Sequence, residues 1–301
     1  MNILGLDLGY NGIKILWMGQ YYKIATTINY YNDSGIDFGE VEVYEFEGNK
    51  YNVGIVAEDS FTTTNFDFLY NFSPLMIYHI LKKLNITEPV LIKTGLALVD
   101  WGDQEKRDKF KERISTIHVN GETITNQVEL VGPQGDGSFR SFIVDNGLSN
   151  NIPKKVSIID IGYKTINFLH YENGRPIPQK SKGFPDHGVV TIIKPFTAFL
   201  ENTYKMAFSE QEAIDIFLTK EFIYNGEEQP KVVEKIAEAK QQFVRKLMNS
   251  ILVSENKTLK LSNVVYISGG GAYMLKDIDL PPNVQIGKEF NEFENVKGYT
   301  L

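Results

Sequence analysis

The sequence lacks cysteine, an excess of basic residues and any long apolar run. Without cysteine, disulfide frameworks, thiolate nucleophiles and cysteine-based zinc sites are excluded. The chain carries 31 lysines and arginines against 38 aspartates and glutamates, a net charge of −7, so direct binding to nucleic acid is not expected. No stretch approaches the ~18 to 20 apolar residues that cross a bilayer, and the N-terminus has no signal-peptide pattern. We therefore expect a soluble, cytoplasmic protein without a membrane partner.

The remaining composition is that of a folded protein with enough residues for two domains. The chain has 301 residues, of which 42% are hydrophobic and 23% charged. Strand-like and helix-like patterns alternate along both halves, which predicts the α/β class. Among the helices, Ser73-Pro74 is typical of a capped helix start and predicts a helix over residues 75–84.

A short internal repeat divides the chain. Residues 6–16 align with residues 159–169, and five of the eleven positions are identical. Each copy is an apolar run, then Asp-x-Gly, then a second apolar run, which predicts a β-hairpin. The first strands of the two hairpins end near Asp7 and Asp160, which lie 153 positions apart. The repeat therefore predicts two related halves, each with a carboxylate at a strand end.

The hairpin turns carry residues suited to phosphate. Glycine lets consecutive backbone N–H groups approach an anion closely, and Lys14 adds a cation after the first turn. Two such hairpins would supply two carboxylates for a divalent cation. Magnesium fits because it accepts one or two carboxylates while bridging phosphate oxygens.

A third glycine site follows the predicted strand at residues 264–267. Ser268-Gly269-Gly270-Gly271-Ala272 stands between that strand and an apolar helix start. A lone triple glycine is often only a flexible turn, but a glycine turn before a helix also lets a ligand lie on the backbone. Beside two matched hairpins, it predicts the base and ribose site of a nucleotide.

These three elements, in this order and spacing, resemble those of the actin-like ATPase superfamily, and within it the bacterial plasmid-segregation actins of the ParM and StbA type. The resemblance covers essentially the whole chain. It implies a duplicated, ribonuclease H-like α/β fold with two similar domains, residues 1–155 and 156–301, flanking a nucleotide cleft. It further implies a small subdomain inserted near residues 30–70, and it allows the C-terminal residues to pack back on the first domain.

The resemblance also implies roles for individual residues toward ATP or ADP and Mg²⁺. Asp7 and Asp160 would hold magnesium and belong to the catalytic set. Gln134, in Pro133-Gln134-Gly135, would orient the attacking water, since a neutral amide is not a strong base. The phosphates would be held by Gly9, Tyr10, Asn11, Gly12, Lys14, Gly162, Tyr163, Lys164 and Thr165. The adenosine would be held by Gly269, Gly270, Gly271 and Ala272.

The second hairpin departs from the family pattern. Tyr163-Lys164 replaces a Gly-Gly pair, and Asn167 replaces an aspartate. Two outcomes are open: the side chains crowd the phosphate turn, or Lys164 adds a phosphate contact.

The function implied by the resemblance is an ATPase that polymerises into cytomotive filaments and segregates plasmid or other DNA through a DNA-binding adaptor protein. Two alternatives stay open, a non-polymerising nucleotide-binding scaffold and a small-molecule kinase of the same fold. The histidines show no metal-site spacing and are interpreted as structural or surface residues: His79, His118, His170 and His187.

Overall fold

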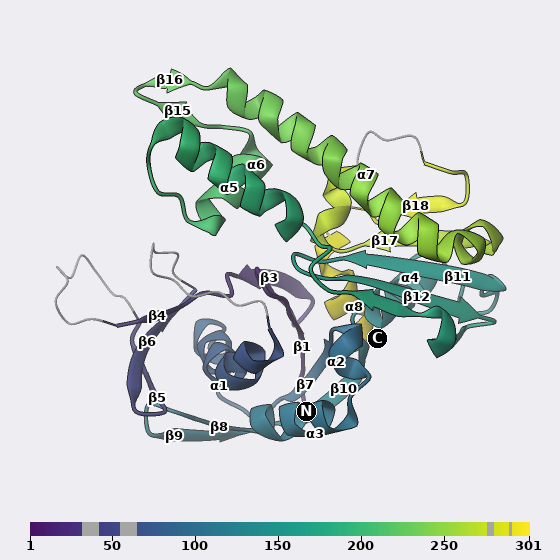
Figure 1. The fold of residues 1–301 in the computed structure, drawn as a ribbon. Coiled ribbons are helices and arrows are strands. Elements are labelled where there is room, and N and C mark those ends of the chain that lie inside the picture. The colour runs from purple at the N-terminus through teal and green to yellow at the C-terminus, as the bar shows by residue number, and fades with distance from the viewer. Residues whose placement is uncertain (32–41, 55–64, 276–279, 289–290) are drawn as a thin grey trace. The chain divides into compact units, whose positions relative to one another are not determined.

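The computed structural model describes residues 1–31, 42–54, 65–275, 280–288 and 291–301, and these form two compact units (Figure 1). The first unit comprises residues 1–149 and 290–301, and the second comprises residues 150–289. The last helix of the chain thus belongs to the first unit. Part of the predicted insertion at residues 30–70 lies outside the described residues.

The first unit is built on a five-stranded sheet in the order β10-β7-β1-β2-β3. Its strands are β1 (Ile3–Leu8), β2 (Ile13–Trp17), β3 (Gln20–Ile24), β7 (Leu91–Leu96) and β10 (Gln127–Pro133). Two small sheets accompany it, formed by β4 (Ile28–Tyr30), β5 (Tyr44–Phe46) and β6 (Asn49–Val53), and by β8 (Thr116–Val119) and β9 (Glu122–Thr125). Its helices are α1 (Phe66–Lys83), α2 (Leu98–Trp101), α3 (Gln104–Ser115), α4 (Asp136–Asp145), α8 (Glu294–Thr300) and the 3₁₀ turn η3 (Asn291–Phe293).

The second unit is built on a six-stranded sheet in the order β13-β12-β11-β17-β18, with β14 also paired to β12. Its strands are β11 (Lys155–Ile161), β12 (Ile166–Glu172), β13 (Arg175–Pro176), β14 (Lys182–Phe184), β17 (Val264–Ser268) and β18 (Val284–Ile286). A short ladder joins β15 (Ile223–Tyr224) to β16 (Glu227–Glu228). The helices are α5 (Val190–Tyr204), α6 (Glu210–Thr219), α7 (Pro230–Leu261) and the 3₁₀ turns η1 (Pro178–Lys180) and η2 (Gly270–Leu275).

The two main sheets share one topology. In the first unit β10, β7 and β1 are mutually parallel, and β2 and β3 return antiparallel. In the second unit β18, β17 and β11 are parallel, and β12 and β13 return antiparallel. The Asp-x-Gly repeat occupies the same place in both, at the turn from the central strand into its antiparallel partner. The short sequence repeat therefore corresponds to a duplication of the fold.

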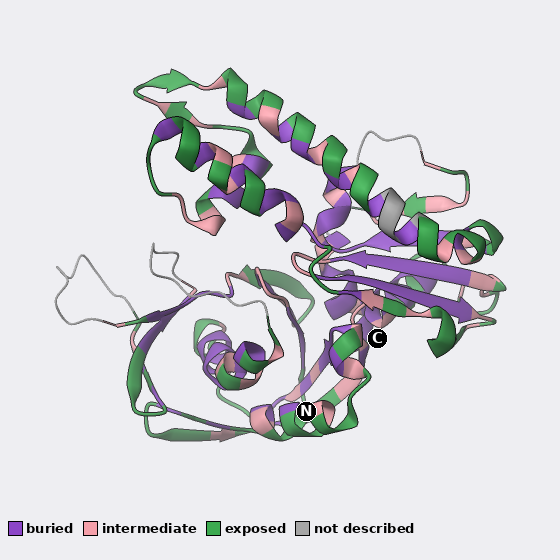
Figure 2. Cartoon of the chain, viewed as in Figure 1, coloured by how far each residue is buried: buried purple, intermediate pink, exposed green. Residues whose placement is uncertain are grey.

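Each unit has its own apolar core. In the first, α1 is enclosed by strands of the sheets and packs Leu75 and Ile77 into the same cluster as Leu4 and Leu6 (Figure 1). In the second, β11 and β12 are buried along nearly their whole length, and α5 and α7 contribute side chains to one cluster (Figure 2). Separate cores are what the chain length allows.

Helix α1 begins nine residues earlier than the sequence pattern suggests, so the predicted start at Ser73-Pro74 is wrong. Asn65 caps the helix by accepting from the Phe68 N–H at 3.1 Å, and Pro74 lies inside the helix. Proline cannot donate to the carbonyl four residues earlier, that of Tyr70. The Nε of Arg113, on α3, donates to that carbonyl at 3.2 Å instead. A contact from elsewhere in the chain thus satisfies the carbonyl that the internal proline leaves unpaired.

None of the helices in the described ranges combines the length and apolar character needed to cross a membrane.

Candidate functional site

The first Asp-x-Gly turn joins β1 to β2. Asp7 is 5% exposed and pairs across the two strands with Lys14. The Gly9 N–H donates to the Asp7 carbonyl at 3.0 Å, and the hydroxyl of Thr26 donates to the Gly9 carbonyl at 2.7 Å. The turn is therefore fixed at both ends of Gly9. Thr26 was not among the predicted site residues, and its only signal in the sequence is the Thr-Thr pair just after β3.

Glycine is needed at position 9 because the Gly12 carbonyl and the Lys14 ammonium lie where a side chain would begin. A Cβ built on Gly9 would lie 2.8 Å from the Gly12 carbonyl oxygen and 3.0 Å from the Lys14 Nζ. The Lys14 ammonium thus lies directly over the glycine turn. A cation beside a tight, partly exposed glycine turn suits an anionic ligand such as a phosphate group. Tyr10 and Asn11, also predicted to hold phosphate, lie in this turn and are half-buried.

Gln134 lies beside Asp7. Its side-chain Nε2 donates to the Asp7 Oδ1 at 2.8 Å, and its main-chain N–H donates to the Leu96 carbonyl at 2.7 Å. The contact follows from topology, because β10, β7 and β1 are parallel and their carboxyl ends meet at one sheet edge. The structure thus brings together an amide and a carboxylate that are 127 positions apart in the sequence.

The second turn, after β11, places Asp160 in the equivalent position. Asp160 is 4% exposed, and the Gly162 N–H donates to the Thr165 carbonyl at 2.9 Å to close the turn. Asn167, opposite Asp160 on β12, points its Nδ2 at the Asp160 Oδ2 over 3.4 Å. An aspartate at position 167 would place a second carboxylate there, so the amide avoids a like-charge pair.

The side chains of Tyr163 and Lys164 are both engaged by other residues of the second unit. The Tyr163 hydroxyl donates to the Glu210 carboxylate on α6, and burial together with this hydrogen bond raises the pKa of the tyrosine. The Lys164 Nζ lies 3.5 Å from the Asp186 Oδ1. The carbonyls of Gly162, Tyr163 and Lys164 accept from the N–H groups of residues 188–190 at the start of α5. The turn is therefore held by α5 and α6.

The third glycine site lies against the second turn. Gly269 has a φ of +85°, and a Cβ there would lie 2.6 Å from the Asp160 Oδ1. A Cβ on Gly271 would lie 2.2 Å from the Ile161 Cγ2. Both glycines are needed for the end of β17 to approach the end of β11. Residues Gly270–Leu275, which include Ala272, form the 3₁₀ turn η2. The α-helix start predicted after the glycines is therefore wrong, because a 3₁₀ turn stands there.

The predicted residues thus form one group in each unit. Asp7, Lys14 and Gln134 lie together in the first, and Asp160 lies with the Gly162 and Gly269 turns in the second. Within the described ranges, no three acidic or histidine side chains cluster as a metal site. One carboxylate per group fits magnesium, which keeps most of its waters and takes few protein ligands.

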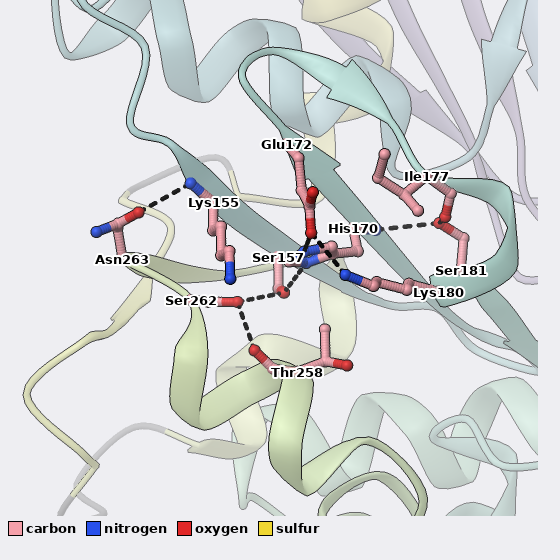
Figure 3. Close-up of polar contacts among 10 residues, drawn as sticks. All are labelled: Lys155, Ser157, His170, Glu172, Ile177, Lys180, Ser181, Thr258, Ser262 and Asn263. Atoms are coloured by element: carbon pink, nitrogen blue, oxygen red, sulfur yellow. Dashed lines mark hydrogen bonds and ion pairs between the residues drawn. The ribbon is translucent and has the colours of Figure 1, made fainter.

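A separate polar network crosses the second sheet (Figure 3). The Ser157 Oγ lies 2.9 Å from the His170 Nδ1, and the His170 Nε2 lies 3.5 Å from the Glu172 Oε1. The order Ser-His-Glu is that of a hydrolytic triad, but the Ser157 side chain is 0% exposed and also contacts the Ser262 Oγ at 2.8 Å. No substrate reaches a serine in that position. The network ties β11 and β12 to the end of α7, which agrees with a structural role for His170.

The network predicts a pH-dependent stability of the second unit. Burial lowers the pKa of His170 below its ordinary 6.5, Lys180 and Lys155 lower it further, and Glu172 opposes them. As the pH falls below about 6.5, His170 takes up a proton in the unfolded chain but not yet in the folded chain. The free energy of unfolding therefore falls as the pH drops from about 6.5 toward the pKa of folded His170. We expect His170→Asn to flatten this slope in urea unfolding followed by circular dichroism. The same substitution at the exposed His118 is the control, and a slope that changes equally in both variants, or in neither, would contradict the assignment.

Two family descriptions match this sequence, one in each half. Residues 5–137 match the family described as actin like proteins N terminal domain. Residues 158–278 match the family described as archaeal actin homologue MreB-like, C-terminal. The sequence has no significant match among curated proteins.

Solved structures resemble the whole chain. The crystal structure of Ta0583, an archaeal actin homologue, has a TM-score of 0.81 at 18% identity, covering 99% of this chain and 98% of that one. Its complex with ADP has a TM-score of 0.79 at 17% identity with the same coverage. A 15-stranded ParM filament from Clostridium botulinum has a TM-score of 0.77 at 18% identity, also covering 99% and 98%. The TM-scores establish a shared fold, and at identities this low they establish the fold alone.

Proposed function

Since this chain belongs to the actin-like superfamily and has the actin-like fold, we propose that it binds ATP with magnesium, assembles into filaments and hydrolyses the nucleotide in them. The observation that carries the proposal is the group formed by Asp7, Lys14 and Gln134. It combines a turn fit for an anion, a strand-end carboxylate and an oriented amide. The ADP complex of Ta0583 and the ParM filament support nucleotide binding and assembly by analogy.

Within this proposal each unit contributes a glycine turn for phosphate and a carboxylate for magnesium. The Gly9 and Gly162 turns and Lys14 bind phosphates, and Asp7 and Asp160 hold magnesium through its waters. Magnesium supplies charge neutralisation on the phosphate oxygens. Gly269 to Ala272 lie against the adenosine, at the turn where the end of β17 approaches the end of β11.

Gln134 positions the attacking water. Its Nε2 is used by Asp7, which leaves the side-chain oxygen as the acceptor for a water proton. A neutral amide orients water without removing its proton, as glutamine does in other nucleotide hydrolases. The hydrogen bond to Asp7 keeps the amide from rotating, so the orientation is set before substrate arrives.

We also propose that the filament moves DNA, such as a plasmid, through an adaptor protein, within the cytoplasm. The net charge of −7 disfavours direct contact with nucleic acid, so the DNA contact falls to the adaptor.

Assembly should depend on nucleotide. Purified protein with ATP and magnesium is expected to scatter light and to form filaments in electron micrographs, whereas protein without nucleotide or with EDTA is not. Absence of filaments with every nucleotide, despite measurable ATP binding, would favour the scaffold alternative. Transfer of phosphate to a sugar, without assembly, would favour the small-molecule kinase.

A further inference from the structure

The last helix of the chain is locked onto the helix that follows Gln134. Helix α8 crosses α4 with backbone against backbone: a Cβ on Gly298 would lie 1.8 Å from the Gly137 carbonyl oxygen, and one on Gly137 would lie 2.3 Å from the Asn295 carbonyl oxygen. At the other end of α4, the Lys297 Nζ pairs with the Asp145 Oδ2 at 2.6 Å. The two helices therefore meet at two separate places.

The N-terminus of α4 lacks a cap of its own. Its N-cap residue is Gly135, which has a φ of +96° and no side chain to accept from the first N–H groups of the helix. Gly135 and Ser138, the residue three positions on, are both buried. Uncapped N–H groups in a buried place would be costly, so a partner must come from elsewhere in the fold.

Asn295 is that partner. Its Oδ1 accepts from the Gly135 N–H at 2.7 Å, from the Ser138 N–H at 3.3 Å and from the Ser138 hydroxyl at 3.2 Å. In an ordinary capping box two side chains of the helix satisfy the N-cap and N3 N–H groups. Here one oxygen, 160 positions away in the sequence, satisfies both.

The same bond fixes the backbone of Gln134. The Gln134 N–H is held by the Leu96 carbonyl at 2.7 Å, and the next N–H, that of Gly135, is held by Asn295. The peptide groups on both sides of the Gln134 Cα are therefore anchored, one to β7 and one to α8. Anchoring both peptides sets the direction of the Gln134 side chain, which reaches Asp7.

We propose that Asn295 is a positioning residue for ATP hydrolysis: by capping α4 it holds Gln134 in the orientation that aligns the attacking water. This inference rests on the proposed ATPase function. Asn295 is buried, and its effect passes through the Gly135 peptide. The C-terminal helix thereby becomes part of the hydrolytic machinery.

The test uses Asn295→Ala, which removes the cap, and Asn295→Asp, which keeps an acceptor oxygen at a helix N-terminus, where negative charge is favourable. Asn65→Ala is the matched control, because Asn65 caps a different helix of the same unit, α1. In the full chain we expect Asn295→Ala to lower kcat about 10-fold with KM within about twofold. Asn295→Asp and Asn65→Ala should stay within about threefold of the wild-type kcat.

Hydrogen exchange provides a readout that does not depend on activity. The Gly135 and Ser138 amides should exchange at least about 10-fold faster in Asn295→Ala than in the wild type, and at the wild-type rate in Asn65→Ala. Three results would overturn this inference and leave the proposed function standing. They are unchanged exchange in Asn295→Ala, an unchanged kcat in Asn295→Ala, or an equal loss of kcat in Asn65→Ala. A wild-type chain that binds ATP without hydrolysing it would overturn the proposed function, and this inference with it.

Discussion

Replacing Gln134 with alanine is expected to lower phosphate release about 100-fold while ATP binding stays within a few-fold of wild type. The side chain places its amide 2.8 Å from the Asp7 Oδ1 and is not part of the glycine turns that we propose to hold phosphate. In the proposed mechanism, its loss removes an interaction with the attacking water and none with the bound nucleotide. Filaments should still form with ATP, because binding of the nucleotide is expected to be nearly unchanged.

The measurement is single-turnover phosphate release beside a binding isotherm for ATP. Gln127→Ala serves as the control, since Gln127 is an exposed glutamine at the other end of the same strand, β10. It should match the wild type in both assays. If Gln134→Ala releases phosphate at the wild-type rate while binding and assembly persist, another residue orients the water.

The closeness of Gln134 and Asp7 could be predicted from the sequence in part, because it depends on the order of parallel strands. Once the apolar runs ending at Leu8, Leu96 and Pro133 are placed in one parallel sheet, their carboxyl ends share an edge. The Asp-x-Gly repeat likewise contains the duplication, since both copies occupy the same turn in sheets of the same topology. The duplication could be predicted because its signal lies within one strand and its turn.

Two hydrogen bonds from distant side chains to helix backbone, at α1 and at α4, could not be predicted. Nothing near Pro74 indicates that Arg113 will bind the Tyr70 carbonyl, so local rules placed the start of α1 at the proline. Nothing near Gly135 indicates that Asn295 will cap α4. In both cases a backbone group that local sequence leaves unpaired is satisfied by a side chain brought there by the tertiary fold. An uncapped helix start in a sequence is therefore a reason to look for a distant cap.

The helix crossing predicts a large effect from a single methyl group. Alanine is favoured over glycine within a helix by about 1 kcal/mol, so Gly298→Ala in α8 would stabilise an isolated helix. In the folded chain the new Cβ would lie 1.8 Å from the Gly137 carbonyl oxygen and 2.4 Å from its carbon, both backbone atoms that no rotamer change can move aside. The helices must separate, which breaks the α4 cap as well. We expect the free energy of unfolding of the first unit to fall by about 3 kcal/mol or more.

Tryptophan fluorescence in urea measures this effect in the right unit, because both tryptophans, Trp17 and Trp101, belong to it. The matched control is Gly102→Ala. Gly102 has helical backbone angles, φ −62° and ψ −20°, and a Cβ there meets nothing closer than 3.7 Å. Its unfolding midpoint should equal or exceed that of the wild type. A Gly298→Ala midpoint as high as the control's would show that α8 and α4 are not packed backbone to backbone, and the capping of α4 by Asn295 would lose its geometric basis.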